Sequence, residues 1–327
     1  MARPATWMAG LWRPIRDDAP PVRTTAAARA RDGCTVGVWH ACRMGRVTQR
    51  TKVTVVDVSG DRPTSRSRTD TVTVEEPLEL RVGGTPLTVT MRTPGHDIEL
   101  VHGFLLTEGI IRDAADVSLA RYCEGAVVSG ESGFEENTYN VIDVTLAPGV
   151  AQPAAELARN FFTSSSCGVC GKASIEQLRA RTQWPVRDDA TRWPAAVITA
   201  MPERMRSEQR SFDKTGGLHA AGLFGPGGEL LAVREDVGRH NAVDKVLGWA
   251  LLSGRLPATG CVLMVSGRAS FELTQKALMG GVPCLAAVSA PSSLAVETAS
   301  DAGMTLLGFV RGATLNVYSR GDRLRFP

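Results

Sequence analysis

Residues 261–279 read Cys-Val-Leu-Met-Val-Ser-Gly-Arg-Ala-Ser-Phe-Glu-Leu-Thr-Gln-Lys-Ala-Leu-Met. The stretch opens with a short apolar run, Cys261–Ser266, which is typical of a buried strand. A polar turn containing Gly267 and Arg268 follows, and Phe271–Met279 then has the pattern of a helix. A strand that leads directly into a helix is the building unit of α/β folds, so this stretch predicts an α/β architecture.

The same alternation runs through the C-terminal half of the chain. Apolar runs predict five further strands, at Ala220–Phe224, Leu230–Val233, Cys284–Val288, Thr305–Phe309 and Leu315–Tyr318. Helical patterns follow at Ala242–Ser253 and Ser293–Asp301. Helices are also expected at 172–182 and near 196–209, with a loop-like connector at 183–194. Strands that alternate with helices favour a three-layer α/β sandwich with a partly parallel sheet.

The N-terminal part has a different, α+β character. Strands are predicted at Val53–Val58, Thr71–Val82, Pro86–Met91 and Asn140–Leu146. Gly83-Gly84 is a hairpin signal between two of these strands. Asp97–Leu106 carries apolar residues on one face, which predicts a helix that Gly109 could stop. Residues 59–70 and 129–138 have a loop-like composition.

The composition limits the classes of function. The chain has 327 residues, 43% of them hydrophobic, and a net charge of +3. Its length indicates two domains or one large one, and we place two, at 44–162 and 163–327. The small charge does not indicate nucleic-acid binding, and no run of about 18 apolar residues predicts a membrane helix. Seven cysteines, an odd number, fit a reducing cytoplasm better than a secreted disulfide framework.

Residues 1–43 differ from the rest of the chain. They are rich in arginine, alanine and proline, show no sustained periodicity and lack the apolar core of a secretory signal. Met44 stands just before the first predicted strand. We therefore expect Met44 to be the native start, and residues 1–43 to be a disordered extension or a stretch added by an over-extended gene prediction. N-terminal sequencing of the native protein would test this.

Two cysteines lie three positions apart in Thr-Ser-Ser-Ser-Cys-Gly-Val-Cys-Gly-Lys, residues 163–172. A helical pattern begins directly afterwards, so Cys167 and Cys170 are expected on a loop, 163–171, that leads into a helix N-terminus. Free N–H groups and the positive end of the helix dipole stabilise anions there, and the thiolate is the reactive form of cysteine. Small neighbours leave room for a second molecule. The pattern predicts an accessible, activated sulfur nucleophile.

Other interpretations of this cysteine pair remain open. A structural zinc site needs four ligands, but the remaining cysteines are single and the five histidines form no HxxxH pair. A thioredoxin-like redox pair would follow a strand in a βαβ unit, whereas Pro153–Phe162 has the pattern of a short helix. A zinc deaminase would show HxE followed by PCxxC, and His219 is followed by Ala-Ala instead. We expect no bound metal.

A second group of polar residues lies between a strand and a helix. The run Glu-Asp-Val-Gly-Arg-His-Asn-Ala-Val-Asp-Lys spans residues 235–245, and the helical pattern begins near Asn241. Ligands of α/β proteins bind beside the carboxyl ends of the strands, so Arg239 and His240 are candidate contacts for a phosphorylated ligand. The alternative is an ordinary capped helix, with Asn241 as the cap and Asp244 and Lys245 on a solvated face.

Two further turns repeat this arrangement. In the first, Gly267 permits close backbone approach, Arg268 can pair with a phosphate, Ser266 lies beside them, and Ser270 can cap the next helix. The second is the serine-rich run 289–293, and Arg311 ends the strand after it. Turns of this kind on one sheet edge predict a shared anion-binding rim. GxGxxG and GxxxxGK[ST] loops are absent, which disfavours a Rossmann dinucleotide site and ATP hydrolysis.

Together these motifs resemble the FdhD family, the formate dehydrogenase accessory sulfurtransferases. The resemblance covers about residues 50–325, and its motifs come in family order. It is carried by Arg92–Gly95, Glu99–Leu105, Ser165–Gly171, Arg234–Lys245, Ser266–Arg268 and Gly308–Arg311.

The resemblance implies a sulfur carrier with a cytidine-deaminase-like α/β domain that lacks the deaminase zinc. It implies that Cys167 accepts sulfur from an IscS-type cysteine desulfurase as a persulfide and passes it to the molybdenum (or tungsten) bis(guanine dinucleotide) cofactor of formate dehydrogenase. It also implies a homodimer that binds GDP as a surrogate of that cofactor. The cofactor-binding segment falls on Phe309, Val310, Arg311, Gly312, Ala313 and Thr314.

Three classes of function follow. The first is the sulfurtransferase, in which Cys170 shapes the loop or helps to release sulfur through a transient disulfide. The second is a dithiol oxidoreductase that depends equally on Cys167 and Cys170. The third is a nucleotide-binding scaffold in which both cysteines are dispensable. The anion rim and the serine-rich cysteine loop favour the first.

Overall fold

The computed structural model describes residues 46–60, 62–123, 128–129, 135–136, 140–153 and 182–326. Several predicted segments lie outside these residues. They are the extension 1–43, most of the loop-like stretch 129–138, the short helix at 153–162 beyond Pro153, the cysteine loop 163–171 with Cys167 and Cys170, and the helix at 172–182 before Thr182. The division into domains at residue 162 falls in the same gap and stays a prediction.

A six-stranded sheet of order β11-β10-β12-β13-β14-β15 forms the centre of the C-terminal half. Its strands are β10 (His219–Phe224), β11 (Leu230–Asp236), β12 (Val262–Val265), β13 (Cys284–Ala287), β14 (Thr305–Arg311) and β15 (Thr314–Ser319). β12, β13 and β14 are parallel neighbours, whereas β10 is antiparallel to both β11 and β12. β11 therefore runs in the same direction as β12, β13 and β14, and the carboxyl ends of these four strands share one sheet edge.

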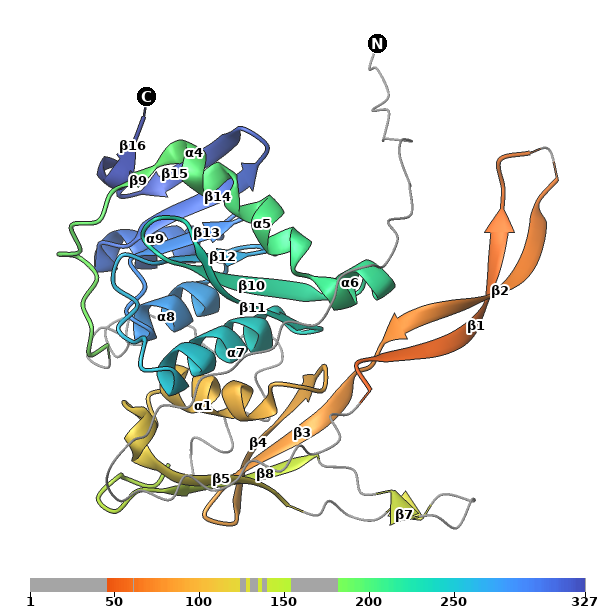
Figure 1. Ribbon diagram of the computed structural model, residues 1–327, viewed down its shortest axis with the longest axis horizontal. Helices are drawn as coiled ribbons and strands as arrows, with labels where there is room; N and C mark the ends of the chain where they lie inside the picture. Colours follow the sequence, from red (N-terminus) through yellow and green to blue (C-terminus); the bar gives the residue numbers. More distant parts are fainter. Residues whose placement is uncertain are drawn as a thin grey trace, which may run out of the picture. The chain divides into compact units, whose positions relative to one another are not determined.

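Helices cover both faces of this sheet (Figure 1). Leu263 and Val265 of β12 point into a core formed with α7 (Arg239–Leu252), α8 (Phe271–Met279) and α9 (Ser293–Ala302). Their neighbours Val262 and Met264 point into a second core with α4 (Ala195–Thr199) and α5 (Met201–Ser207). Alternate residues of a strand face opposite sides, so a strand buried on both faces is apolar throughout. The predicted three-layer α/β sandwich is confirmed.

The single helix expected near 196–209 is instead a series of short pieces. α4 ends at Thr199, α5 begins at Met201 with a proline in its first turn, and α6 (Arg210–Thr215) follows. Proline has no backbone N–H to donate into a preceding turn, so Pro202 favours a new helix start. The connector before these helices contains the short strand β9 (Trp193–Pro194). β9 pairs in parallel with β16 (Leu324–Arg325), which follows the 3-10 turn η2 (Gly321–Arg323) in the sequence.

The N-terminal part forms a four-stranded sheet of order β4-β3-β8-β5. Its strands are β3 (Glu76–Val82), β4 (Thr85–Arg92), β5 (Val117–Cys123), which follows the 3-10 turn η1 (Ala114–Asp116), and β8 (Val141–Leu146). Gly83 and Gly84 both have positive φ, 57° and 79°, as a tight hairpin turn requires, so the predicted hairpin is confirmed. α1 (Asp97–Thr107) packs against this sheet, and the short strands β6 (Val128–Ser129) and β7 (Glu135–Glu136) pair with each other.

Two sequence expectations in this part were wrong. Residues 64–70 were expected in a loop, but they belong to β2 (Thr64–Thr73), which pairs along its whole length with β1 (Thr48–Asp57). The strand expected over Thr71–Val82 is divided into β2 and β3 at residues 74–75. The β1–β2 ribbon is largely exposed, so β2 needs no apolar face and shows none of the alternation by which strands are predicted.

Helices α1 and α7 pack unusually closely. A Cβ atom added to Gly103 would lie 1.8 Å from the carbonyl oxygen of Asp244, and one added to Gly248 would lie 1.8 Å from the carbonyl oxygen of Glu99. Atoms cannot approach so closely, so only glycine permits this helix contact at either position. The contact brings the N-terminal sheet and its helix against the central α/β sandwich.

Candidate functional site

The sheet edge at the carboxyl ends of β11 to β14 gathers polar side chains from several elements. Arg239 and His240 come from the start of α7, Gly267 and Arg268 from the turn after β12, and Glu272 from α8. His219 joins them because β10 runs antiparallel to its neighbours, which places its first residue at their carboxyl ends. We call this group, together with Ser266, the rim.

Helix α7 begins earlier than the sequence indicated. Its first residue is Arg239, with Gly238 at the N-cap position and no side-chain cap. The predicted start near Asn241 and the capping role of that residue were wrong. Asn241 instead donates hydrogen bonds to the carbonyl oxygen of Met91 (2.8 Å) and to Asp236 (3.1 Å). Arg239 and His240 therefore occupy the first helical turn, where the helix dipole favours anions.

A carboxylate holds the ring of His240. Its Nε2 lies 3.0 Å from Oε2 of Glu272, and that oxygen also accepts a hydrogen bond of 3.1 Å from the hydroxyl of Ser270. The hydrogen bond from His240 is the largest cause that lowers the pKa of Glu272, to about 2. Glu272 is therefore an anion at any physiological pH and fixes one nitrogen of the imidazole. Ser270 caps α8 as predicted, because its hydroxyl accepts the N–H of Leu273.

Gly267 has no side chain to cover the space between His219 and Arg239. A Cβ atom at this position would lie 3.5 Å from Nδ1 of His219 and 3.8 Å from Cδ of Arg239. Burial, followed by the positive charges of Arg239 and His240, lowers the pKa of His219 below 6.5, against a smaller opposite effect of Asp236. The ring of His219 is therefore neutral at pH 7, although it lies in a cationic group.

Apart from His240, the basic side chains of the rim have unsatisfied hydrogen-bonding groups in the part of the chain that the structure describes. Nε of Arg239 is buried and makes no hydrogen bond there. Arg268 is exposed, and neither its side chain nor that of His219 forms a hydrogen bond or ion pair with a described residue. A buried donor without a partner is unfavourable and is rare in native proteins. Such a group is suited to binding an anion, since a phosphate would supply the missing acceptors.

The turn after β13 joins the rim to the end of β14. Ala269 pairs with Pro291 in a β-bridge, and the backbone N–H of Phe309 donates to the carbonyl oxygen of Ser289 (3.2 Å). Phe309 has a φ of +51°, an uncommon conformation for a bulky residue that often marks a functional segment. The guanidinium of Arg311 lies 5.8 Å from the centre of its ring.

The structure thus brings most of the predicted binding residues to one sheet edge. Ser266 has a structural hydrogen bond, because its hydroxyl accepts the N–H of Ala220 at 2.9 Å. Val310 is buried in the core, whereas Arg311, Gly312, Ala313 and Thr314 are exposed on the hairpin between β14 and β15. Sequence reasoning missed His219 and Glu272. No sequence motif marked His219 as a binding residue, because it is simply the first residue of a strand. Glu272 could have been found, since it lies about one helical turn after Arg268, which had been selected.

The three cysteines within the described residues include two that are unsuited to sulfur chemistry. Cys261 and Cys284 are buried, and burial raises the pKa of Cys261 to about 11 and that of Cys284 still further above its ordinary value. A thiol needs to ionise in order to react, so both are inert core residues. Cys123 is half-buried at the end of β5. The predicted nucleophile Cys167 and its neighbour Cys170 lie outside the described residues.

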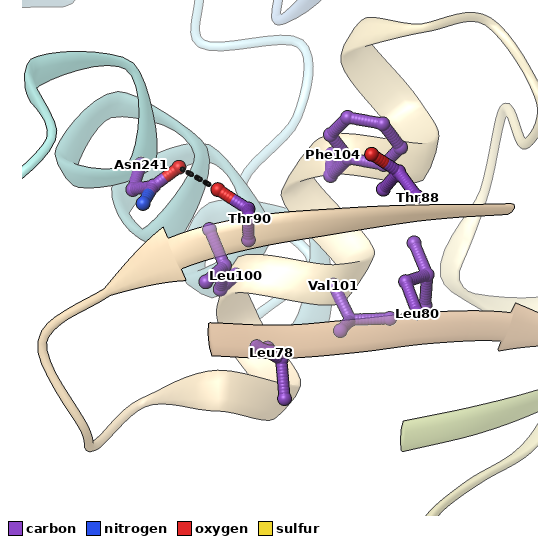
Figure 2. Close-up of a pocket in the computed structure, with 8 residues that line it drawn as sticks. All are labelled: Leu78, Leu80, Thr88, Thr90, Leu100, Val101, Phe104 and Asn241. Carbon is purple, nitrogen blue, oxygen red and sulfur yellow. Dashed lines mark hydrogen bonds between the residues drawn. The ribbon is translucent and has the colours of Figure 1, made fainter. Parts of the chain in front are cut away.

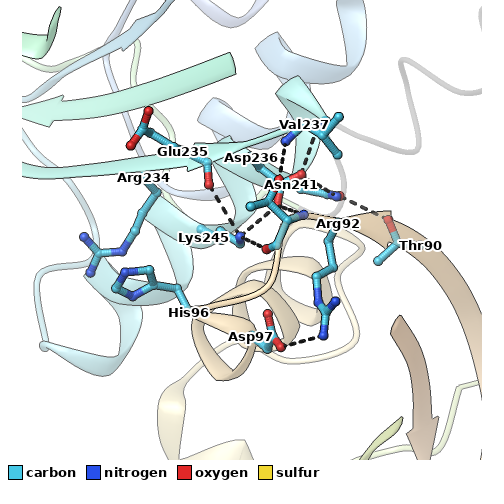
Figure 3. A network of polar contacts seen from close by, with 12 residues as sticks. Thr90, Arg92, His96, Asp97, Arg234, Glu235, Asp236, Val237, Asn241 and Lys245 are labelled. Carbon is cyan, nitrogen blue, oxygen red and sulfur yellow. Dashed lines mark hydrogen bonds and ion pairs between the residues drawn. The ribbon is translucent and has the colours of Figure 1, made fainter. Parts of the chain in front are cut away.

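Three other residues of the 234–245 motif, Asp236, Asn241 and Lys245, form a polar network between α7 and the N-terminal part (Figure 3). Nζ of Lys245 lies 2.7 Å from Asp236 and donates to the carbonyl oxygen of Thr93 at 2.8 Å. Asp236 also accepts the backbone N–H groups of Thr93 and Gly238. Lys245 is 1% exposed and Asp236 is fully buried. The alternative that placed Lys245 on a solvated face was therefore wrong.

A second buried pair joins α7 to α8. Nζ of Lys276 in α8 is 2.9 Å from both carboxylate oxygens of Asp244, and the hydroxyl of Thr107 donates to the same carboxylate. Burial lowers the pKa of Lys276, but Asp244 and Glu108 outweigh that effect and raise it. Asp244 is thus buried as well, against the solvated-face alternative. We call the two pairs Asp236–Lys245 and Asp244–Lys276 the joint.

A small cavity lies between α1 and the strands β3 and β4, beside the joint (Figure 2). Leu78, Leu80, Leu100, Val101 and Phe104 supply most of its lining, and its volume is about 10 Å³. That is room for about one water molecule, far below the ~300 Å³ of a pocket for an organic ligand. It is a packing defect of the core.

Among the described residues, no helix has both the length and the apolar character needed to cross a bilayer. The histidine, cysteine and acidic side chains of the same residues include no group of three that could hold a metal ion.

The chain resembles known proteins over most of its length. It is 56% identical over 279 residues to the sulfur carrier protein FdhD of Mycolicibacterium paratuberculosis, which covers 85% of this chain and 99% of that protein. It is 54% identical over 282 residues to the protein of the same name from Streptomyces coelicolor, covering 86% and 97%. The likeness to the 23% identical formate dehydrogenase accessory protein of Desulfotalea psychrophila concerns the fold, with a TM-score of 0.65 over 86% of this chain and all of that one.

The family comparison agrees with these relatives. Residues 73–325, which include the rim, the joint and the cysteine loop, match the FdhD/NarQ family. The matched span begins at the end of β2 and ends in β16, so it contains the whole α/β sandwich and the N-terminal sheet. The chain is a member of the FdhD/NarQ family.

Proposed function

We propose that the chain is a sulfur carrier that accepts sulfur on Cys167 and delivers it to the molybdenum bis(guanine dinucleotide) cofactor of formate dehydrogenase. The donor is an IscS-type cysteine desulfurase, and the protein acts as a homodimer in the cytoplasm, where thiols stay reduced. The observation that carries the proposal is the identity of more than half of the aligned residues with proteins named sulfur carrier protein FdhD, over nearly their full length.

The proposed chemistry is thiol exchange. The thiolate of Cys167 attacks the outer sulfur of the donor's persulfide, so the donor's sulfur–sulfur bond breaks as a new one forms on Cys167. The donor leaves as its own thiolate, and the new persulfide holds a transferable sulfur. Neither Cys261 nor Cys284 suits this role, since their buried thiols resist ionisation. Cys170 then shapes the loop or assists sulfur release.

The rim supports the delivery half of the proposal. The sulfur acceptor is a large polyanion with two diphosphate groups, and the rim presents Arg239, His240 and Arg268 at the sheet edge where α/β proteins bind ligands. The exposed hairpin residues 311–314 extend that edge. GDP, which carries one such diphosphate and the guanine base, would serve as a surrogate ligand.

Intact-protein mass spectrometry tests the carrier chemistry. The full chain is incubated with a cysteine desulfurase and cysteine, in parallel with Cys167→Ala and Cys170→Ala variants. We expect a reducible gain of about 32 Da, one sulfur, that is lost in Cys167→Ala and kept in Cys170→Ala. Equal loss in both variants, with a mass decrease of two hydrogens in the wild type, would favour the dithiol oxidoreductase. No gain in any protein would favour the nucleotide-binding scaffold.

A further inference from the structure

We propose that His219 completes the anion site of the rim and takes up one proton from solvent when a diphosphate group binds between it and Arg239. The inference deepens the proposed function, from which it takes the class of ligand. His219 was not among the residues selected from the sequence, and it enters the site through the antiparallel direction of β10.

The first support is geometric. His219 and Arg239 both border the space above Gly267, where a Cβ atom would approach Nδ1 of His219 to 3.5 Å and Cδ of Arg239 to 3.8 Å. A larger residue at 267 would fill that space. Glycine at position 267 thus leaves the space between these two nitrogen-bearing side chains uncovered, and we place the anion there.

The second support is the set of unpartnered donors. Nε of Arg239 is buried without a hydrogen bond, and the ring nitrogens of His219 receive none from described residues. His240 differs, because Glu272 already binds its Nε2. Among the described residues of the rim, His219, Arg239 and the exposed Arg268 therefore have hydrogen-bonding capacity that a ligand could satisfy, and the first two of them border Gly267.

The third support is the charge around His219. Arg239 and His240 face it from α7, Asp236 faces it from the end of β11, and Gly267 faces it from the turn after β12. Lys245 lies 2.7 Å from Asp236 and neutralises much of its charge. The field at the imidazole is therefore positive, and with burial it holds the pKa of His219 down.

An anion reverses that balance. A diphosphate placed beside Arg239 adds negative charge within a few ångströms of the imidazole, which favours its charged form. The sign follows from linkage: if binding raises the pKa of His219, protonation of His219 tightens binding by the same factor. GDP should therefore bind more tightly as the pH falls from 8 to 6, by up to about tenfold for each unit by which the pKa rises.

Proton NMR of the imidazole rings measures this directly. The chain has five histidines, and a His219→Gln variant assigns the resonance. Titrations of the full chain from pH 8 to pH 5, with and without saturating GDP, should show the His219 midpoint below 6.5 in the empty protein and higher with GDP. His102, which is buried and bonded to the carbonyl oxygen of Ile98, is the internal control and should keep its midpoint.

Two variants make the test independent of folding defects. Arg239→Gln should raise the His219 midpoint in the empty protein, because a nearby cation is removed. His219→Gln should bind GDP with a weaker dependence on pH than the wild type; the phosphate's own titration is common to both proteins and cancels in the comparison. An unmoved His219 midpoint at saturating GDP, a His219 already charged in the empty protein at pH 7, or no binding of GDP would each overturn the proposal.

The outcome is separable from that of the proposed function. A His219 midpoint that rises with GDP, in a chain whose Cys167 gains no sulfur, would leave this inference standing and remove the carrier chemistry. Sulfur gain on Cys167 with an unmoved His219 would do the opposite.

Discussion

The rim and the joint use the same residue types for opposite purposes. Both draw on residues 234–245 at the start of α7, yet Lys245 has a carboxylate at 2.7 Å and a carbonyl at 2.8 Å, whereas Arg239 has a buried nitrogen with no described partner. The difference lies in the direction of the two side chains, since residues along a helix point to different faces. Charges that are paired inside the protein hold the fold together, and charges left unpaired at the sheet edge are available to a ligand.

Breaking the joint should have the largest effect on stability. Lys245→Met leaves the fully buried Asp236 without its cation, and the loss of one partner from a buried pair costs about 3–5 kcal/mol. The shift of the urea midpoint measures it. The matched control is Arg68→Met, which removes one member of the exposed pair with Asp70 and should cost less than about 1 kcal/mol. Equal stability of the two variants would refute the structural role of the joint.

Forcing α1 and α7 apart should have the second largest effect on stability. Gly103→Ala places a methyl group against the backbone of Asp244, and overpacking of this kind costs about 1–3 kcal/mol. Gly60→Ala is the control, because its Cβ would meet only one atom, at 3.9 Å. Thermal unfolding of both variants decides the matter. If the Gly103→Ala protein has the same melting temperature as the Gly60→Ala protein, the two helices can move apart without loss of stability, and the prediction is wrong.

Removing the carboxylate of Glu272 from the rim should have the smallest effect on stability. Glu272→Gln ends the ion pair with a half-exposed His240, so the expected loss is below about 1 kcal/mol after allowance for solvent screening. The pKa of Glu272 is lowered from 4.5 to about 2 by folding, so the contribution is complete above pH 5 and declines as the pH falls from 4.5 toward 2. Urea midpoints of the wild type and the variant at pH 7, 4 and 3 should converge on acidification. A gap that widens instead would contradict this assignment.

The strand-to-helix turns of the rim could be predicted because serine, glycine and arginine follow apolar strands there, and β11 to β14 run in one direction. His219 could not, since its place depends on the antiparallel direction of β10, which no local pattern specifies. Lys245 and Asp244 were assigned to solvent as an alternative because polar residues usually face water. Their burial depends on partners far away in sequence, Thr93 and Thr107. The exposed ribbon strand β2 lacked an apolar face and was missed for that reason.

The division between rim and joint is tested most directly by comparing Arg239→Gln with Lys245→Met in two measurements on the same preparations, the urea midpoint and the dissociation constant for GDP. We predict that each variant changes mainly one of the two quantities. Arg239→Gln should keep the wild-type midpoint and bind GDP about tenfold more weakly, whereas Lys245→Met should lose much of its stability. An Arg239→Gln protein that unfolds as easily as Lys245→Met, or that binds GDP as the wild type does, would contradict the account.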